Sequence, residues 1–116
     1  MSGLMNKDEK QIYSLIGLCQ KAGYVKAGEF MTEKTVKSGL ACLVIVADDS
    51  SDNTKKKFRN MTDFYEVPYR DFGDKDNLGN SIGCEFRASL AITNKGLADK
   101  IISKIDNIKN KENNQI

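Results

Sequence analysis

One uninterrupted apolar run constrains the fold of this chain more than any other feature. The run LACLVIVA, residues 40–47, lies between Gly39 and Asp48. Its length, its β-branched residues and its lack of polar alternation predict a strand that is covered on both faces. Because each face of such a strand needs its own layer of helices, the run predicts a central strand inside a layered α/β structure.

Helical and extended patterns alternate on either side of this run. Asn6, followed three residues later by Glu9, predicts a capped first helix, and Asn94 is placed to cap the last one. Pro68 opens an extended segment and favours an edge position, because proline lacks the N–H that an inner strand donates. The other elements are expected at residues 24–27 (extended), 29–38 (helix), 52–61 (helix), 68–72 (strand), 74–83 (helix), 88–93 (strand) and 95–109 (helix).

This alternation predicts one α/β domain, a three-layer α/β/α sandwich around a small mixed sheet of three or four strands. A chain of 116 residues matches the usual size of a single domain. We place the domain at residues 6–109, after a flexible N-terminal segment of residues 1–5 and before a polar, frayed tail of residues 110–116. So few strands argue against a dinucleotide-binding fold, which needs about six.

The composition argues against catalysis and against a metal site. The chain has no histidine, which removes Ser-His and Cys-His chemistry and imidazole ligands together. Its cysteines, Cys19, Cys42 and Cys84, are odd in number, far apart and set among apolar or small residues, so we expect reduced thiols. We therefore expect a protein that is not an enzyme, needs no cofactor or metal, and takes no small-molecule substrate.

The apolar residues are spread too thinly for a membrane protein. No stretch approaches the roughly 20 apolar residues of a membrane span, and the first ten residues, MSGLMNKDEK, lack the apolar core of a signal peptide. A cytoplasmic protein with no membrane partner is expected.

The distribution of lysines points to two candidate anion-binding segments. A net charge of +2 is too small to indicate a nucleic-acid-binding protein, but lysines gather in KKKFR, residues 55–59, and in KAGYVKAGEFMTEKTVKSG, residues 21–39. In the second segment Gly28 opens a helix whose N–H groups can bind a phosphate, and Lys34 and Lys37 share a face that extends this contact. The residues alone favour the other interpretation, glycine turns beside a solvated helix face, and they favour a solvated face for KKKFR as well.

A third candidate is Phe86, which stands between Glu85 and Arg87 in an expected loop before a strand. An exposed aromatic ring at this place is able to stack on an unpaired base. A core position at the edge of the strand explains the same residue equally well, so the pattern alone leaves both interpretations open.

Ordered segments along the chain resemble the kink-turn-binding superfamily of ribosomal proteins, the L7Ae and L30e type, and within it a small bacterial YlxQ-like branch. The resemblance covers residues 12–105, and its clearest segments are LIGLCQKAG, AGEFMTEKTVKSGLACLVIVADD and LGNSIGCEFRASLAITNKGLADKI. No single motif carries it. It implies an α/β/α sandwich that binds kink-turns in RNA.

The resemblance assigns roles to the segment that follows Gly28. In that family a glycine opens the second helix, polar side chains beside it meet the sheared G·A pairs of the kink-turn, and a later lysine contacts RNA. Gly28 matches the glycine and Lys34 the lysine, and Glu29 and Lys37 flank them. The two polar positions, often Asn-Glu or Lys-Gln in the family, are occupied by Phe30 and Met31. Neither side chain can form the expected hydrogen bonds to guanine.

The family's second contact is a loop with an apolar-acidic-apolar pattern that packs against an extruded nucleotide. Cys84, Glu85 and Phe86 match this pattern, and Arg87 follows them. With the resemblance, Phe86 becomes a favoured RNA contact, because an aromatic face can stack on a base.

We therefore expect a non-enzymatic RNA-binding protein, a monomer in isolation, that recognises a kink-turn or a similar bent helix-loop element in structured RNA. The alternative is a protein-protein interaction module on the same fold, in which Phe30 and Met31 form an apolar patch if they are exposed.

Overall fold

The computed structural model describes residues 5–113 and shows helices and strands in alternation. Most of the flexible segment expected at residues 1–5, and the last residues of the expected tail, 114–116, lie outside the described residues. Within the described range the elements are α1 (Lys7–Lys21), β1 (Val25–Ala27), α2 (Glu29–Lys37), β2 (Leu43–Val46), α3 (Asp52–Tyr65), β3 (Tyr69–Asp71), α4 (Lys75–Ser81), β4 (Ser89–Ile92) and α5 (Lys95–Asn113).

The four strands form one mixed sheet in the order β1-β4-β2-β3. β4 pairs antiparallel with β1 and with β2, whereas β2 and β3 are parallel. β2 and β4 are the inner strands, and all their residues are buried. The predicted central strand is confirmed, and the segment after Pro68 lies at an edge as proline requires.

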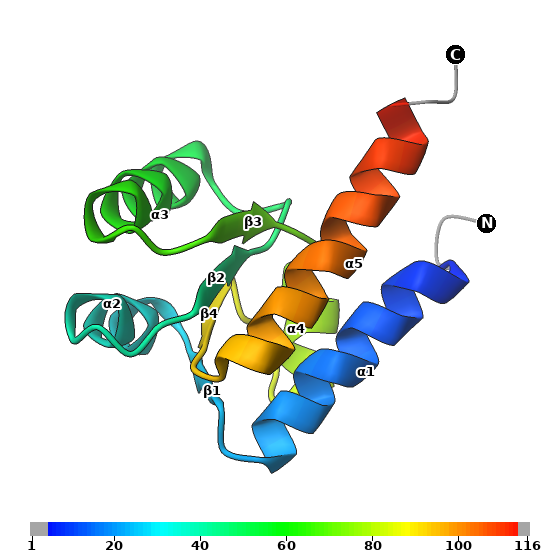
Figure 1. Cartoon of the computed structure of the whole chain (residues 1–116), viewed down its shortest axis with the longest axis horizontal. Helices are drawn as coiled ribbons and strands as arrows, with labels where there is room; N and C mark the ends of the chain where they lie inside the picture. Colours follow the sequence, from blue (N-terminus) through cyan, green and yellow to red (C-terminus); the bar gives the residue numbers. More distant parts are fainter. Residues whose placement is uncertain (1–4, 114–116) are drawn as a thin grey trace.

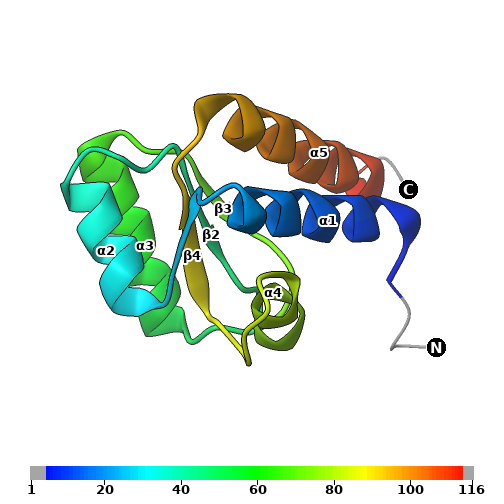
Figure 2. The same ribbon diagram turned by 90° about the horizontal axis from the view of Figure 1, so that it is seen from below.

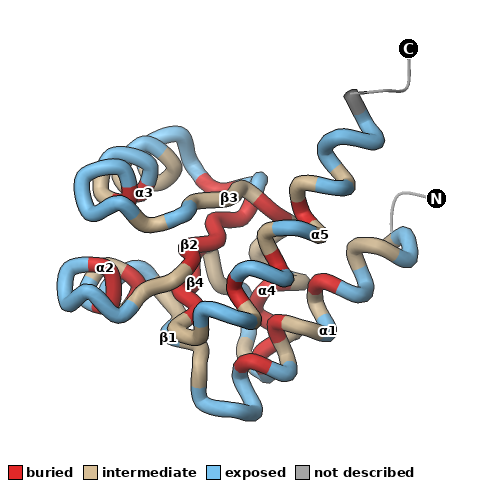
Figure 3. The backbone as a smooth tube through the Cα atoms, viewed as in Figure 1, coloured by how far each residue is buried: buried red, intermediate tan, exposed pale blue. Residues whose placement is uncertain are grey.

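Helices cover both faces of this sheet (Figure 1). α1, α4 and α5 lie on one face, where Ile12, Ile16, Leu78 and Ile101 belong to the larger apolar core. α2 and α3 lie on the other face over a smaller core that contains Phe58. The buried strands β2 and β4, coloured red in Figure 3, lie between the two helical layers. The predicted three-layer α/β/α sandwich is confirmed. None of the helices within residues 5–113 is long and apolar enough to cross a membrane.

Side-chain caps fix the starts of the first and last helices. The Asn6 side chain accepts a hydrogen bond from the Glu9 N–H at 2.8 Å, and the Glu9 carboxylate accepts one from the Asn6 N–H at 3.2 Å, a complete capping box. The Asn94 side chain accepts from the Leu97 N–H at 2.9 Å. α5 continues through Asn113 and so extends into the segment expected as a polar tail.

The smaller core makes a direct test of this packing possible. Phe58 of α3 is fully buried, whereas Phe64 of the same helix is 77% exposed. We expect Phe58→Ala to lower the free energy of unfolding by about 3–5 kcal/mol, because it removes apolar contacts and leaves a cavity. Phe64→Ala, the matched control, should lower it by less than about 1 kcal/mol. Urea denaturation measures both, and similar losses in the two variants would contradict the assigned packing.

Candidate nucleic-acid interface

Three segments that are distant in the sequence meet at one edge of the molecule. The Gly28 N–H, before α2, donates to the Ser89 carbonyl at 2.9 Å. The Ala88 carbonyl accepts from the Ala47 N–H at 2.9 Å and from the Ser50 hydroxyl at 3.4 Å, which ties the loop before β4 to the segment that leads into α3. Figure 2 shows the starts of α2 and α3 and the loop before β4 along its lower edge. We call residues 28–31 and 84–87 together the α2-loop surface.

Backbone geometry at Gly28 opens one side of this surface. Gly28 is the N-cap of α2 with φ 93°, a value that non-glycine residues rarely adopt, and no side chain caps the helix. A Cβ at Gly28 would meet nothing within 4 Å, so conformation and not space requires glycine. The first-turn N–H groups of a helix have no partner within the helix, and the helix dipole adds a partial positive charge there. The N–H groups at the start of α2 are therefore suited to donate hydrogen bonds to an oxygen of an anionic ligand.

The first turn of α2 presents an aromatic ring to solvent. Phe30 is 74% exposed, Met31 is partly buried, and Thr32 is fully buried. Phe30 and Met31 thus occupy the positions where the resemblance predicts polar side chains. This turn offers an apolar face and a stacking plane in place of hydrogen-bonding groups.

The loop before β4 is braced against α4. The Cys84 N–H donates to the Gly79 carbonyl at 2.9 Å, and the Arg87 N–H donates to the Lys75 carbonyl at 3.0 Å. A Cβ at Gly79 would overlap the Glu85 carbonyl oxygen, so the loop approaches α4 more closely than any other residue type would permit. The loop backbone is consequently held in one place.

This braced loop holds Phe86 outward. Phe86 is 60% exposed, and the Lys75 ammonium lies 5.9 Å from the centre of its ring. A cation at this distance attracts the face of the ring by about 0.5–1 kcal/mol at an exposed site. Glu85 is exposed as well, whereas Cys84 and Arg87 are partly exposed, and the Arg87 guanidinium donates to the Phe86 carbonyl at 2.8 Å. The interpretation of Phe86 as a core residue is wrong.

The predicted lysines of α2 differ in their surroundings. Lys34 is exposed and forms no ion pair with any residue in the range 5–113. Lys37 lies in the last turn, roughly 12 Å along the helix from Glu29, and its ammonium pairs with the Glu33 carboxylate at 2.7 Å. The structure therefore separates Lys37 from the α2-loop surface.

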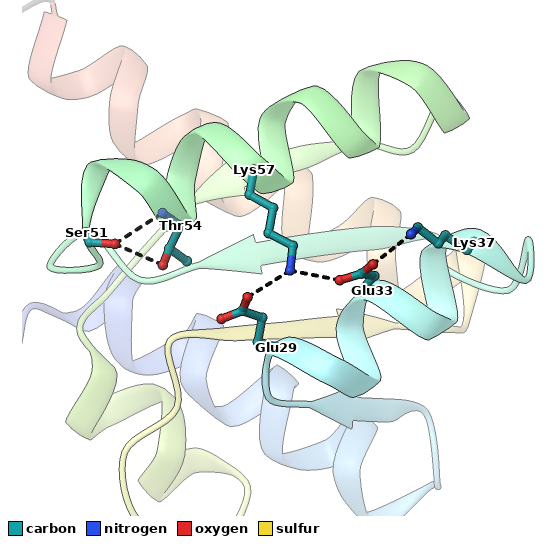
Figure 4. Close-up of polar contacts among 6 residues, drawn as sticks. All are labelled: Glu29, Glu33, Lys37, Ser51, Thr54 and Lys57. Carbon is teal, nitrogen blue, oxygen red and sulfur yellow. Dashed lines mark hydrogen bonds and ion pairs between the residues drawn. The ribbon is translucent and has the colours of Figure 1, made fainter.

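An ion-pair network joins α2 to α3 (Figure 4). The Lys57 ammonium lies 2.8 Å from a carboxylate oxygen of Glu29 and 2.8 Å from one of Glu33, and Glu33 also binds Lys37. These contacts lower the pKa of Glu33 to about 2, with Lys37 the largest cause and Lys57 the next. Glu29 and Lys57 thus neutralise each other beside the start of α2.

The rest of KKKFR is also partly occupied. The Arg59 guanidinium pairs with the Asp71 carboxylate at 2.7 Å, while Lys55 and Lys56 form no ion pair within the described part of the chain. The interpretation of this segment as a solvated helix face agrees with the exposure of Lys56 and Arg59.

Two residues that the sequence reasoning missed organise this surface. Lys75 stands over the Phe86 ring, and Gly79 admits the loop backbone. Gly79 carried a usable signal, because glycine inside a helix costs about 1 kcal/mol relative to alanine and often marks a close backbone approach. The sequence held no such signal for Lys75, because its contact with the Phe86 ring depends on how α4 and the loop pack.

Comparisons with known proteins point to one family. The model of the ribosomal protein L7Ae/L30e/S12e/Gadd45 family matches residues 10–102. The RNA-binding protein YlxQ of Bacillus subtilis (strain 168) is 38% identical over 94 residues, which cover 81% of this chain and 94% of that protein. The RNA-binding protein YlxQ of Enterococcus faecium is 35% identical over 97 residues, which cover 83% of this chain and 93% of that protein.

Solved structures share the fold. A protein with unknown function from Bacillus halodurans C superimposes with a TM-score of 0.80 and 31% identity, over 83% of this chain and 97% of that one. The Giardia lamblia 15.5kD RNA binding protein superimposes with a TM-score of 0.73 and 22% identity, over 90% of this chain and 92% of that one. The second likeness supports the fold alone.

The close approach at Gly79 predicts a specific effect on the loop. In Gly79→Ala the new methyl group would overlap Glu85, so the loop must move. We expect large changes in the backbone amide chemical shifts of residues 84–87 and a lower melting temperature. Gly96→Ala is the matched control, because the nearest atom to its new Cβ is 3.5 Å away and alanine favours the helix. Unchanged loop shifts in Gly79→Ala would contradict the assigned contact.

The network around Glu33 predicts an acid-shifted titration. Nuclear magnetic resonance of the side-chain carboxyl should give Glu33 a pKa of about 2. Lys37→Gln should raise this pKa most, Lys57→Gln less, and Lys56→Gln, the control, very little, because Lys56 is not part of the network. Since the folded state lowers the pKa, the stabilisation is present above pH 4.5 and is lost as the pH falls toward 2. A Glu33 pKa near its ordinary value of 4.5 in the parent protein would refute the network.

Proposed function

Because the chain belongs to the ribosomal protein L7Ae/L30e/S12e/Gadd45 family, we propose that it is a non-enzymatic RNA-binding protein that recognises a kink-turn or a similar bent helix-loop element in structured RNA. Two relatives with 35–38% identity over most of the chain are RNA-binding proteins by name, which supports the proposal. The observation that carries it is the α2-loop surface, which presents two exposed aromatic rings, Phe30 and Phe86, next to an uncapped helix N-terminus.

Each part of the α2-loop surface has a role that its chemistry supports. The free N–H groups after Gly28 bind a phosphate oxygen, since the helix dipole favours negative charge there. Phe86 stacks on an unpaired, extruded nucleotide, a contact that contributes about 1–3 kcal/mol per base. Lys34, Lys75 and Arg87 surround these contacts with positive charge that attracts the RNA backbone.

Phe30 and Met31 change how the RNA is recognised. Sheared G·A pairs expose hydrogen-bonding edges, which a phenyl ring and a thioether do not satisfy. A phenyl ring 74% exposed beside the phosphate site stacks on a base or packs on a sugar instead. The protein therefore recognises the bent shape and the unstacked nucleotides, with less dependence on the identity of the G·A pairs.

The ion pairs of Glu29 also fit this role. A free carboxylate in the first turn of α2 would repel a phosphate at the helix N-terminus, but Lys57 balances its charge at 2.8 Å. Lys57 thus assists RNA binding indirectly, while Lys37 is placed too far along the helix to share the phosphate site.

A second function class is favoured by the same exposed ring. Phe30 and Met31 form an apolar patch at the start of α2, and a protein partner that packs on this patch would make the chain an interaction module. Affinity purification with and without ribonuclease separates the two functions. A partner that stays bound after ribonuclease treatment and is lost in Phe30→Ala would support the interaction module.

Substitutions on the α2-loop surface and at Lys34 beside it should separate stacking from charge. Titrations of the purified protein with a kink-turn RNA at two salt concentrations should show that Phe86→Ala weakens binding by about 1–3 kcal/mol with little change in salt slope. Lys34→Ala should weaken binding and lower the salt slope by about 0.7–0.9, because one phosphate contact is lost.

Phe64→Ala is the matched aromatic control, since Phe64 is also well exposed, 77% against 60% for Phe86, but lies at the far end of α3. A second RNA whose G·A pairs are replaced by Watson–Crick pairs tests whether the bend is recognised, and it should bind more weakly. Unchanged affinity of both Phe86→Ala and Lys34→Ala for the kink-turn would contradict RNA binding at the α2-loop surface.

A further inference from the structure

A shallow groove of about 630 Å³ runs between α1 and α5, on the opposite side of the sheet from α2 and α3. The two helices are antiparallel, because Asp8 pairs with Lys111 and Gln11 contacts Lys104 (Figure 1). Leu15 and Leu18 provide its apolar lining, and Leu18 is 53% exposed. Because Leu18 keeps about half of its contact with water, a partner that covers it gains apolar burial.

The rim of this groove is positive on both sides. Lys7 and Lys10 line it from α1, and Lys100 and Lys104 line it from α5. No acidic residue lines the groove in the part of the chain that the structure describes. Among these four lysines the only side-chain hydrogen bond within residues 5–113 is from Lys104 to the neutral amide oxygen of Gln11 at 3.3 Å.

Three acidic residues of the same helices pair with cations that do not line the groove. Asp8 pairs with Lys111, Asp99 pairs with Lys95, and Asp106 pairs with Arg70. The positive charge of the groove is therefore not balanced by these carboxylates, and it surrounds an apolar floor.

We propose that this lysine-rimmed groove binds an acidic amphipathic helix of a partner protein. A helix that lies along a groove between two helices places an apolar stripe on the floor, and here Leu15 and Leu18 receive it. Aspartate or glutamate on both flanks of the stripe then meets the lysines of α1 on one side and those of α5 on the other. The occupant is defined by this charge complementarity together with the apolar floor.

RNA and lipid fit the groove less well. A phosphate backbone would pair with the lysines but would offer the leucines no apolar contact. Among residues 5–113 no aromatic side chain lines the groove for base stacking. A membrane surface calls for a broad apolar helix face, whereas this groove offers two leucines set between charged side chains.

None of residues 28–31 and 84–87 lines the groove, so it is separate from the α2-loop surface; Figure 2 shows α1 and α5 on the side of the sheet away from α2 and α3. The protein can therefore hold an acidic helix and another ligand at the same time. The inference does not depend on the proposed RNA function.

Fluorescence anisotropy with the purified protein tests the proposal. The probe is a labelled peptide of about five helical turns with a leucine stripe flanked by glutamates. Its controls are a peptide of the same composition with the stripe scrambled, a peptide with the leucines replaced by serines, a kink-turn RNA and vesicles that contain anionic lipid. The variants are Lys10→Glu with Lys104→Glu, and Leu18→Gln. Lys26→Glu with Lys56→Glu is the matched charge control, because both lysines are exposed and lie outside the groove.

The striped peptide should bind, and the scrambled and serine peptides should bind about tenfold more weakly or not at all. The double charge reversal in the groove and Leu18→Gln should each weaken the striped peptide about tenfold, while the control reversal changes its affinity less than about twofold. RNA affinity should be unchanged in Leu18→Gln. Failure of the striped peptide to bind, equal binding of the scrambled peptide, or a groove reversal that affects only RNA or only vesicles would overturn the proposal.

Discussion

The antiparallel pairing of β2 with β4 is the constraint on which the rest of the structure depends. Both strands are buried along their whole length, so helices must cover both faces of the sheet. The register places Val46, at the end of β2, opposite Ser89, at the start of β4. Because the two strands run in opposite directions, the segment that leaves β2 and the loop that enters β4 lie at the same edge of the molecule.

The second antiparallel pair brings α2 to that edge. β1 pairs with β4 so that Ala27 lies opposite Leu90, and the next residue, Gly28, bonds to Ser89. The start of α2 and the loop before β4 are thus neighbours because of strand register, although more than 50 residues separate them in the sequence. Besides this strand register, the α2-loop surface depends on two glycines: Gly28 has a positive φ, and Gly79 lacks a Cβ that would overlap the loop.

Much of the fold follows from local sequence patterns. The apolar run before Asp48 predicts a buried inner strand, Asn6 and Asn94 predict helix starts, and Pro68 predicts an edge. These features are set by neighbouring residues, so the sequence shows them directly. The direction of each strand pair depends on which strands become neighbours, so the patterns predicted a mixed sheet without assigning a partner to any strand.

The candidate site could be predicted only in part. Local patterns marked Gly28 and Phe86 as candidates but left ordinary explanations open, a glycine turn for the first and a core position for the second, and the resemblance to a family favoured an RNA contact at both. The ion pairs of Glu29 with Lys57, and the place of Lys75 over the Phe86 ring, join elements that only tertiary packing brings together. Lys37 shares a helical face with Lys34. It lies in the last turn of α2 and pairs with Glu33, so it is distant from the α2-loop surface.

Binding of structured RNA at the α2-loop surface is the central claim, and a titration of isotope-labelled protein with a kink-turn RNA, followed by nuclear magnetic resonance, tests it most directly. We expect the backbone amide signals of Gly28, Phe30, Phe86 and Arg87 to shift in proportion to bound RNA, while those of Leu18 and its neighbours on α1 stay unchanged. Saturation with RNA that leaves the first four amides unchanged, or no binding at low salt, would contradict it.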